Sequence, residues 1–174
     1  MSRPRTIYII GFMGSGKTTA GKKLASRLAW SFIDLDRKIA EQSGSTIPEL
    51  FSKHGENYFR NIESAVLKNL KYETNTVIST GGGTPCHEDN MDFMLSTGLT
   101  VYLKLTPAQL MKRLSESSGQ RPLVKNLDGN SLLGFIEEKL AYRETWYSRA
   151  EIILEGFDID IKRLQSLVNE KLNF

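Results

Sequence analysis

Short apolar segments alternate with segments of helical periodicity along most of the chain. The apolar segments lie at 7–10, 31–33, 77–79, 100–105 and 152–154, and their length is typical of buried strands. Between them, apolar residues recur every three or four positions, the spacing that gives a helix one apolar face. This alternation predicts one α/β domain, with a parallel sheet covered by helices on both faces.

The expected helices lie between these strands, and capping residues mark several of their ends. They cover about 18–28, 36–42, 46–53, 57–72, 88–96, 106–116, 131–149 and 161–172. Thr46 and Thr106 each precede a Glu or Gln by three positions, which is the capping-box pattern of a helix start. His54-Gly55 predicts a turn between two separate helices.

Composition restricts the class of protein and of partner. The 174 residues include 40% hydrophobic and 25% charged residues, with a net charge of +3, as in a soluble globular domain. No basic run suggests a nucleic-acid or membrane partner, and an anionic small molecule suits the charge equally well. Cys86 is the single cysteine, so an internal disulfide is excluded. Without an apolar run of about 20 residues or a signal-peptide core, the chain is expected to be cytoplasmic. It is also expected to be a monomer.

The segment Gly11–Thr18 matches the phosphate-loop pattern G-x-x-x-x-G-K-[ST]. A predicted strand precedes it and a predicted helix follows it, as this chemistry requires. Lys17 would reach the β- and γ-phosphates of ATP, and the Thr18 hydroxyl would bind Mg²⁺. The alternative, a glycine-rich turn with a chance lysine, explains neither flanking element. The expected nucleotide-binding residues of the loop are Gly14, Ser15, Gly16, Lys17, Thr18 and Thr19.

Two carboxylates follow the second predicted strand, at the edge of the sheet where α/β proteins bind ligands. Asp34 and Asp36 are two positions apart there. One of them can hold Mg²⁺ while the other meets an acceptor hydroxyl. For Asp36 the alternative role is a helix cap, and both roles can hold at once.

Further candidate residues lie on the next helix and after the third strand. The guanidinium of Arg60 has the planar fork that binds a carboxylate through two hydrogen bonds, and Glu63 three residues on could hold it in place. An ordinary surface ion pair is the alternative. Gly81–Gly83 lets the backbone approach a ligand closely, or is simply a flexible strand exit.

These motifs together resemble the shikimate kinase family. They are the phosphate loop, Asp34-x-Asp36, Phe59-Arg60-x-x-Glu63, Gly81–Gly83 and the arginine-bearing segment near 121. The resemblance covers about 7–154. It implies a three-layer α/β/α fold of the nucleoside-monophosphate-kinase type, with a five-stranded parallel sheet of order 2-3-1-4-5. It also implies transfer of phosphate from ATP, with Mg²⁺, to the 3-hydroxyl of shikimate.

The same resemblance implies a division of the chain into parts. All of 1–174 would form a single P-loop kinase domain, whose core covers 6–116 and 131–174. A helical region at about 36–62 would bind shikimate, and a mobile lid would cover about 117–130.

Roles for individual residues also follow from the resemblance. Asp34 would lie beside Mg²⁺. Asp36 would bind the shikimate hydroxyls and would either accept the proton of the acceptor hydroxyl or orient that hydroxyl. Arg121, in the lid, would contact the transferred phosphate, and Arg113 would stack on adenine. The residues expected to bind shikimate are Asp36, Arg60, Gly81, Gly82, Gly83 and Arg143.

Some assignments stay open. Phe51 and Phe59 match aromatic residues of the substrate pocket, yet helical spacing equally suits the core. The segment 155–160, where adenine contacts are expected, gives no residue match. A gluconate or nucleoside-monophosphate kinase is the rival enzyme, although Arg60 with Arg143 suits a monocarboxylate. A nucleotide-binding regulatory module is the rival from another class, and it would not need Asp36 or a lid arginine.

Overall fold

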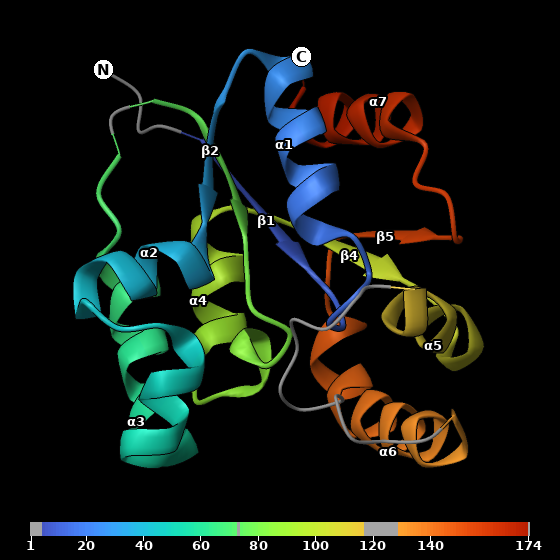
Figure 1. Ribbon diagram of the computed structural model, residues 1–174. Coiled ribbons are helices and arrows are strands. Elements are labelled where there is room, and N and C mark those ends of the chain that lie inside the picture. The colour runs from blue at the N-terminus through green and yellow to red at the C-terminus, as the bar shows by residue number, and fades with distance from the viewer. Residues whose placement is uncertain (1–4, 73, 117–128, 174) are drawn as a thin grey trace.

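The computed structural model describes residues 5–72, 74–116 and 129–173, which form a three-layer α/β/α domain (Figure 1). Five parallel strands make one sheet of order β2-β3-β1-β4-β5. They are β1 (Thr6–Ile10), β2 (Ser31–Asp34), β3 (Thr76–Ser79), β4 (Leu99–Lys104) and β5 (Ile152–Glu155). Both the strands and their order confirm the sequence-based prediction.

Helices cover both faces of the sheet. They are α1 (Lys17–Leu28), α2 (Leu35–Ser43), α3 (Ile47–Asn69), α4 (Asn90–Thr97), α5 (Pro107–Glu116), α6 (Gly129–Tyr147) and α7 (Ile161–Leu172), with a 3₁₀ turn, η1, at Thr84–Cys86. Side chains of β1 alternate between two cores. Ile7 and Ile9 pack with α1 and α7, whereas Tyr8 and Ile10 pack with the helices of the opposite face. This alternation is the two-residue period of a strand buried on both sides.

Local sequence signals account for most helix ends. The Thr46 hydroxyl accepts from the Glu49 N–H at 3.3 Å, and the Glu49 carboxylate accepts from the Thr46 N–H at 2.8 Å, so the predicted capping box is present. Thr106 forms the same reciprocal pair with Gln109. The predicted break at His54-Gly55 is present. Gly55 has φ 82° and ψ 174°, a non-helical conformation that kinks α3 between two helical segments.

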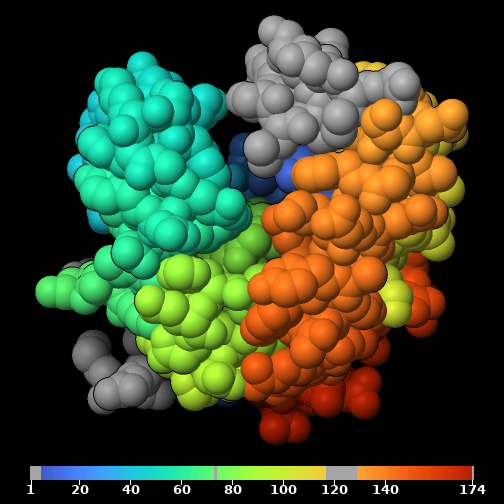
Figure 2. All heavy atoms as spheres, turned by 90° about the horizontal axis from the view of Figure 1, so that it is seen from below, coloured from blue at the N-terminus to red at the C-terminus, as the bar shows by residue number. Residues whose placement is uncertain are grey.

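The carboxyl ends of β1, β2 and β3 lie at one edge of the sheet, and each leads directly into candidate site residues. β1 leads into the phosphate loop, β2 ends at Asp34, and β3 is followed by Gly81–Gly83. Figure 2 looks onto this edge, where a hollow separates α3 from α6 and blue atoms near the phosphate loop lie at its floor. Within the described residues, no helix is long and apolar enough to cross a membrane.

Candidate active site

The phosphate loop wraps the N-terminus of α1. Gly14 and Gly16 have φ of 80° and 92°, values that side chains other than glycine rarely adopt. Lys17 is almost fully buried, and its Nζ donates to the carbonyl oxygens of Gly11 and Phe12 at 2.9 Å each. The lysine therefore braces the loop, and its charge remains beside the place where phosphates bind.

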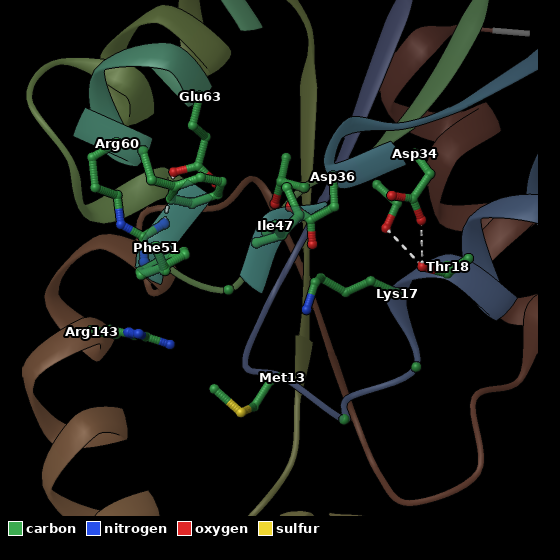
Figure 3. A pocket seen from close by; sticks show the side chains of 18 of the residues that line it. Met13, Lys17, Thr18, Asp34, Asp36, Ile47, Phe51, Arg60, Glu63 and Arg143 are labelled. Atoms are coloured by element: carbon green, nitrogen blue, oxygen red, sulfur yellow. Dashed lines mark hydrogen bonds and ion pairs between the residues drawn. The ribbon is translucent and has the colours of Figure 1, made fainter. Parts of the chain in front are cut away.

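Thr18 and Asp34 meet beside the loop. The Thr18 hydroxyl donates to Asp34 Oδ2 at 2.9 Å (Figure 3). The other carboxylate oxygen of Asp34 accepts from the Arg37 N–H at 3.2 Å. Asp34 is thus the N-cap of α2. The capping role considered for Asp36 therefore belongs to Asp34. One hydroxyl and one carboxylate are a donor set that fits Mg²⁺, which takes few protein ligands alongside phosphates and water.

Asp36 lies in the first turn of α2 and faces the pocket. Asp36 keeps exposed surface in the open pocket, yet the surrounding protein partly desolvates its carboxyl and raises the pKa to about 6, and the negative charges of Glu63 and Asp34 act in the same direction. The nearby Lys17 and Arg60 oppose this shift. A carboxyl with a pKa close to neutrality can either accept a proton or orient a hydroxyl.

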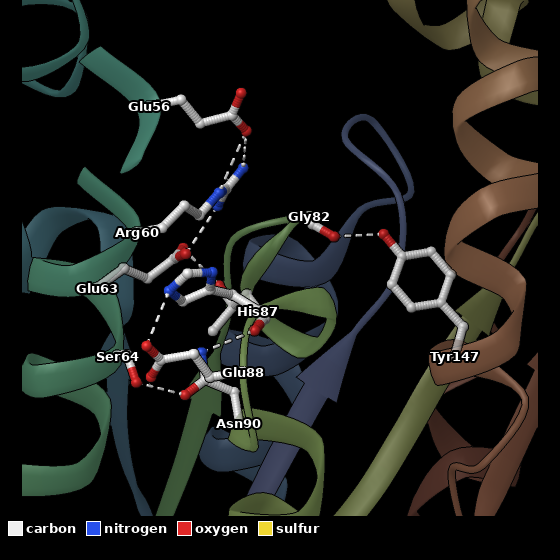
Figure 4. Close-up of polar contacts among 10 residues, drawn as sticks. Glu56, Arg60, Glu63, Ser64, Gly82, His87, Glu88, Asn90 and Tyr147 are labelled. Carbon is white, nitrogen blue, oxygen red and sulfur yellow. Dashed lines mark hydrogen bonds and ion pairs between the residues drawn. The ribbon is translucent and has the colours of Figure 1, made fainter. Parts of the chain in front are cut away.

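Arg60 is held by a fully buried carboxylate. Its Nη1 lies 2.7 Å from Glu63 Oε2, and Glu63 Oε1 accepts from the Thr84 hydroxyl at 2.6 Å. Glu63 has no exposed surface, so the alternative of an ordinary surface ion pair is wrong. Glu56 contacts the outer side of the same guanidinium at 3.5 Å (Figure 4). The guanidinium is therefore fixed in orientation before any ligand binds.

The glycine triplet has a use that the sequence did not reveal. A Cβ atom at Gly83 would lie 2.3 Å from Arg60 Nη2, and one at Gly82 would lie 3.2 Å from Arg143 Nη1. At Gly81 a Cβ would lie 2.7 Å from Glu63 Oε1. At Gly81 and Gly83 a side chain would displace Glu63 or Arg60, and at Gly82 the guanidinium of Arg143 would have to give way by a few tenths of an ångström. The glycines thus leave room for the charged groups around the pocket.

Arg143 approaches the pocket from the opposite side, on α6. Its guanidinium lies 5.2 Å from the centre of the Phe12 ring, and its Nη1 is buried without a hydrogen-bond partner among the described residues. A buried guanidinium nitrogen with no partner is costly unless a ligand supplies an acceptor. Arg143 therefore indicates an anion-binding position.

These groups line one pocket of about 440 Å³. Arg60 and Arg143 lie on one side of it, and Lys17, Asp34 and Asp36 lie on the other (Figure 3). Sequence reasoning placed most of the polar lining and offered Phe51 and Phe59 as possible lining residues, which the structure confirms. It missed the other apolar residues of the pocket, Met13, Ile47 and Pro48. Phe59 is also 3% exposed and belongs to the core, so both readings hold for it.

The remaining predicted residues lie elsewhere. Arg113 does not line this pocket. Its Nη1 donates to the Ser15 carbonyl at 3.3 Å, its Nη2 donates to the Phe157 carbonyl, and its guanidinium lies 4.7 Å from the Phe157 ring centre. Arg113 therefore connects the phosphate loop to the segment after β5. Arg121 and most of the predicted lid lie outside the described residues.

The fold and the contents of this pocket define a phosphate-loop kinase with a small acceptor. Similarity to known proteins shows which family of phosphate-loop kinases this chain belongs to. The family model for shikimate kinase matches residues 13–171. Shikimate kinase from Phocaeicola vulgatus is 42% identical over 171 residues, covering 96% of this chain and 98% of that protein. The chain belongs to the shikimate kinase family, in which ATP is the phosphate donor.

Solved structures agree with this assignment. The crystal structure of shikimate kinase from Bacteroides thetaiotaomicron is 38% identical, with a TM-score of 0.88 and coverage of 98% of this chain and 99% of that one. Shikimate kinase from Acinetobacter baumannii in complex with shikimate is 32% identical, with a TM-score of 0.83 and coverage of 98% and 94%.

Proposed function

We propose that this chain transfers the γ-phosphoryl group of ATP to the 3-hydroxyl of shikimate, with Mg²⁺, giving shikimate 3-phosphate and ADP. The observation that carries this proposal is the pairing of Arg60 and Arg143 in the same pocket as Lys17 and Asp36. Two guanidinium groups suit one carboxylate, and the opposite side suits a hydroxyl beside a phosphate chain.

The acid would be oriented by its carboxylate. Arg60 presents a fork fixed by Glu63, and Arg143 Nη1 offers the donor that has no protein acceptor. Main-chain N–H groups of Gly81–Gly83 would complete the contacts, since glycine has no side chain of its own to cover them. Phe51 and Phe59 line the pocket and would pack against the carbon ring. Binding at one end in this way directs the hydroxyl at the other end toward the phosphate loop.

The phosphates of ATP would occupy the loop at the N-terminus of α1, with Lys17 beside the β- and γ-phosphates. Thr18 and Asp34 would hold Mg²⁺, which supplies positive charge to the phosphate oxygens when bound. Arg113 is proposed to lie under adenine. Arg121 is proposed to contact the transferred phosphate on the strength of the sequence alone.

During transfer a bond forms between the acceptor oxygen and the γ-phosphorus, and the bond from that phosphorus to the β–γ bridging oxygen breaks. Asp36 would accept the hydroxyl proton. Because the transition state of phosphoryl transfer is loose, holding the hydroxyl in line contributes at least as much as removing its proton. Negative charge on the phosphate oxygens is met by Lys17, whose position is fixed by the loop carbonyls.

We also propose that the chain works as a monomer in the cytoplasm, with 36–62 as the shikimate-binding region and 117–130 as the lid of one kinase domain.

A coupled ADP-release assay tests the proposed function. The purified chain is given ATP and Mg²⁺ with shikimate, gluconate or each nucleoside monophosphate. Shikimate is expected to give turnover far above the rate without acceptor, and the other acceptors are not. Faster turnover with gluconate or a nucleoside monophosphate would assign the pocket to that acceptor instead.

A further inference from the structure

Tyr147 is fully buried at the C-terminal end of α6, one helical turn after Arg143. Its ring packs against Tyr102 on β4, with ring centres 4.9 Å apart. Its hydroxyl donates to the carbonyl oxygen of Gly82, in the glycine triplet (Figure 4). This hydrogen bond ties α6 to the segment that follows β3.

The contact has a geometric consequence for the pocket. The peptide bond between Gly82 and Gly83 is trans, so its N–H points away from its carbonyl. With the carbonyl turned toward Tyr147, the N–H of Gly83 points away from α6. At Gly82 itself, a Cβ atom would lie 3.2 Å from Arg143 Nη1, so the triplet and the guanidinium pack together closely. A shift of α6 would therefore move Arg143 relative to the triplet, and the hydrogen bond from Tyr147 to Gly82 resists such a shift.

The phenol of Tyr147 stays protonated, as a hydrogen-bond donor must be. Burial raises the pKa of Tyr147 well above its ordinary value, and the positive charge of Arg143 opposes that shift only in part. The phenol consequently stays protonated and remains a donor to the Gly82 carbonyl at any pH where the protein works.

We propose that Tyr147 is a positioning residue for acceptor recognition, whose hydroxyl locks the Gly82 peptide to α6 and so holds Arg143 in place to bind the carboxylate. This inference rests on the proposed function, because it takes the acceptor to be a carboxylic acid. It adds a residue that touches neither the acid nor ATP and acts only through Arg143.

The test is Tyr147→Phe, which removes one oxygen atom and keeps the ring that packs on Tyr102. Tyr8→Phe is the matched control. Tyr8 is also buried, at 1% exposed, and its hydroxyl bonds to Thr97 at 3.0 Å, in a pair that does not line the pocket. Thermal unfolding of both variants shows whether they lose comparable stability. Titrations then give the affinity of each for shikimate and for ATP.

Tyr147→Phe is expected to weaken shikimate binding about ten-fold, equivalent to about 1.4 kcal/mol, and to leave ATP affinity within about two-fold. Tyr8→Phe should change neither affinity. In an Arg143→Ala background, Tyr147→Phe should weaken shikimate binding by less than about two-fold more, because coupled residues are not additive.

Two results would overturn the inference while leaving the proposed function intact. One is normal shikimate affinity in Tyr147→Phe, and the other is an undiminished loss in the Arg143→Ala background. Failure of the wild-type chain to bind and phosphorylate shikimate would instead remove the proposed function, and the inference with it.

Discussion

The pair formed by Arg60 and Glu63 allows a quantitative prediction with an internal control. Glu63→Gln keeps the shape of the side chain and removes its charge. Glu63 has no exposed surface, and the Arg60 side chain is 15% exposed, so the pair is close to fully desolvated. Removing one partner of a buried pair costs about 3–5 kcal/mol, because the other charge stays buried.

Two features of the site make the expected loss of unfolding free energy smaller than about 3–5 kcal/mol. Arg60 retains Glu56 at 3.5 Å, and a glutamine oxygen at position 63 can still accept from the Thr84 hydroxyl. We therefore expect the free energy of unfolding to fall by about 2–3 kcal/mol. The control is Glu56→Gln, which removes the same charge from a side chain that is 66% exposed. A surface partner of this kind contributes no more than about 0.5 kcal/mol.

Urea unfolding followed by tryptophan fluorescence measures both losses, and shikimate titration of the folded variants follows. Glu63→Gln should also weaken shikimate binding, since the Arg60 fork loses the group that orients it, whereas Glu56→Gln should have little effect. Losses of unfolding free energy that are small and equal in the two variants would refute the argument. They would mean that the burial of Glu63 does not increase the contribution of its ion pair with Arg60 to the free energy of unfolding.

Three further substitutions separate the parts of the site. Lys17→Ala should leave the fold intact and lower kcat by about 100-fold or more, so retention of over about a tenth of the activity would contradict its role. Asp36→Asn should lower kcat by about 100-fold with ATP affinity unchanged in steady-state kinetics; loss of stability alone would leave Asp36 without a role toward the acceptor. Gly83→Ala should push the Arg60 guanidinium away from Glu63, so it should raise the KM for shikimate about ten-fold or more and also lower stability. Its control, Gly134→Ala on α6, meets nothing within 4 Å and should leave that KM unchanged.

Sequence patterns predicted the fold because its signals are local. The phosphate loop between a strand and a helix, the two capping boxes and the short apolar runs each need only neighbouring residues to be recognised. The sheet order came from the family resemblance. The break at His54-Gly55 is a further local signal. The glycine predicted a turn there, and Gly55 has the non-helical backbone that kinks α3 at that point.

The site was less accessible to sequence reasoning, because burial and close approach are properties of the folded chain. Spacing paired Arg60 with Glu63 but left a surface ion pair possible, and only the complete burial of Glu63 decides the matter. The glycines were expected to approach a ligand, whereas Gly83 directly adjoins Arg60. Tyr147 carried one signal, its position one turn after Arg143, but its bond to Gly82 joins residues 65 positions apart.

The central claim is that Arg60 binds the carboxylate of the acceptor, and a pair of titrations tests it most directly. Shikimate and its carboxamide, which lacks the charge, are each titrated into wild type and Arg60→Ala. Loss of a buried charge-assisted contact costs about 2–5 kcal/mol, so the variant should bind shikimate at least about 30-fold more weakly. ATP affinity should not change, and Arg60→Lys should also be impaired because it lacks the fork. The wild type is expected to prefer the acid strongly and the variant to lose most of that preference. An equal preference for acid over amide in both proteins would contradict the account.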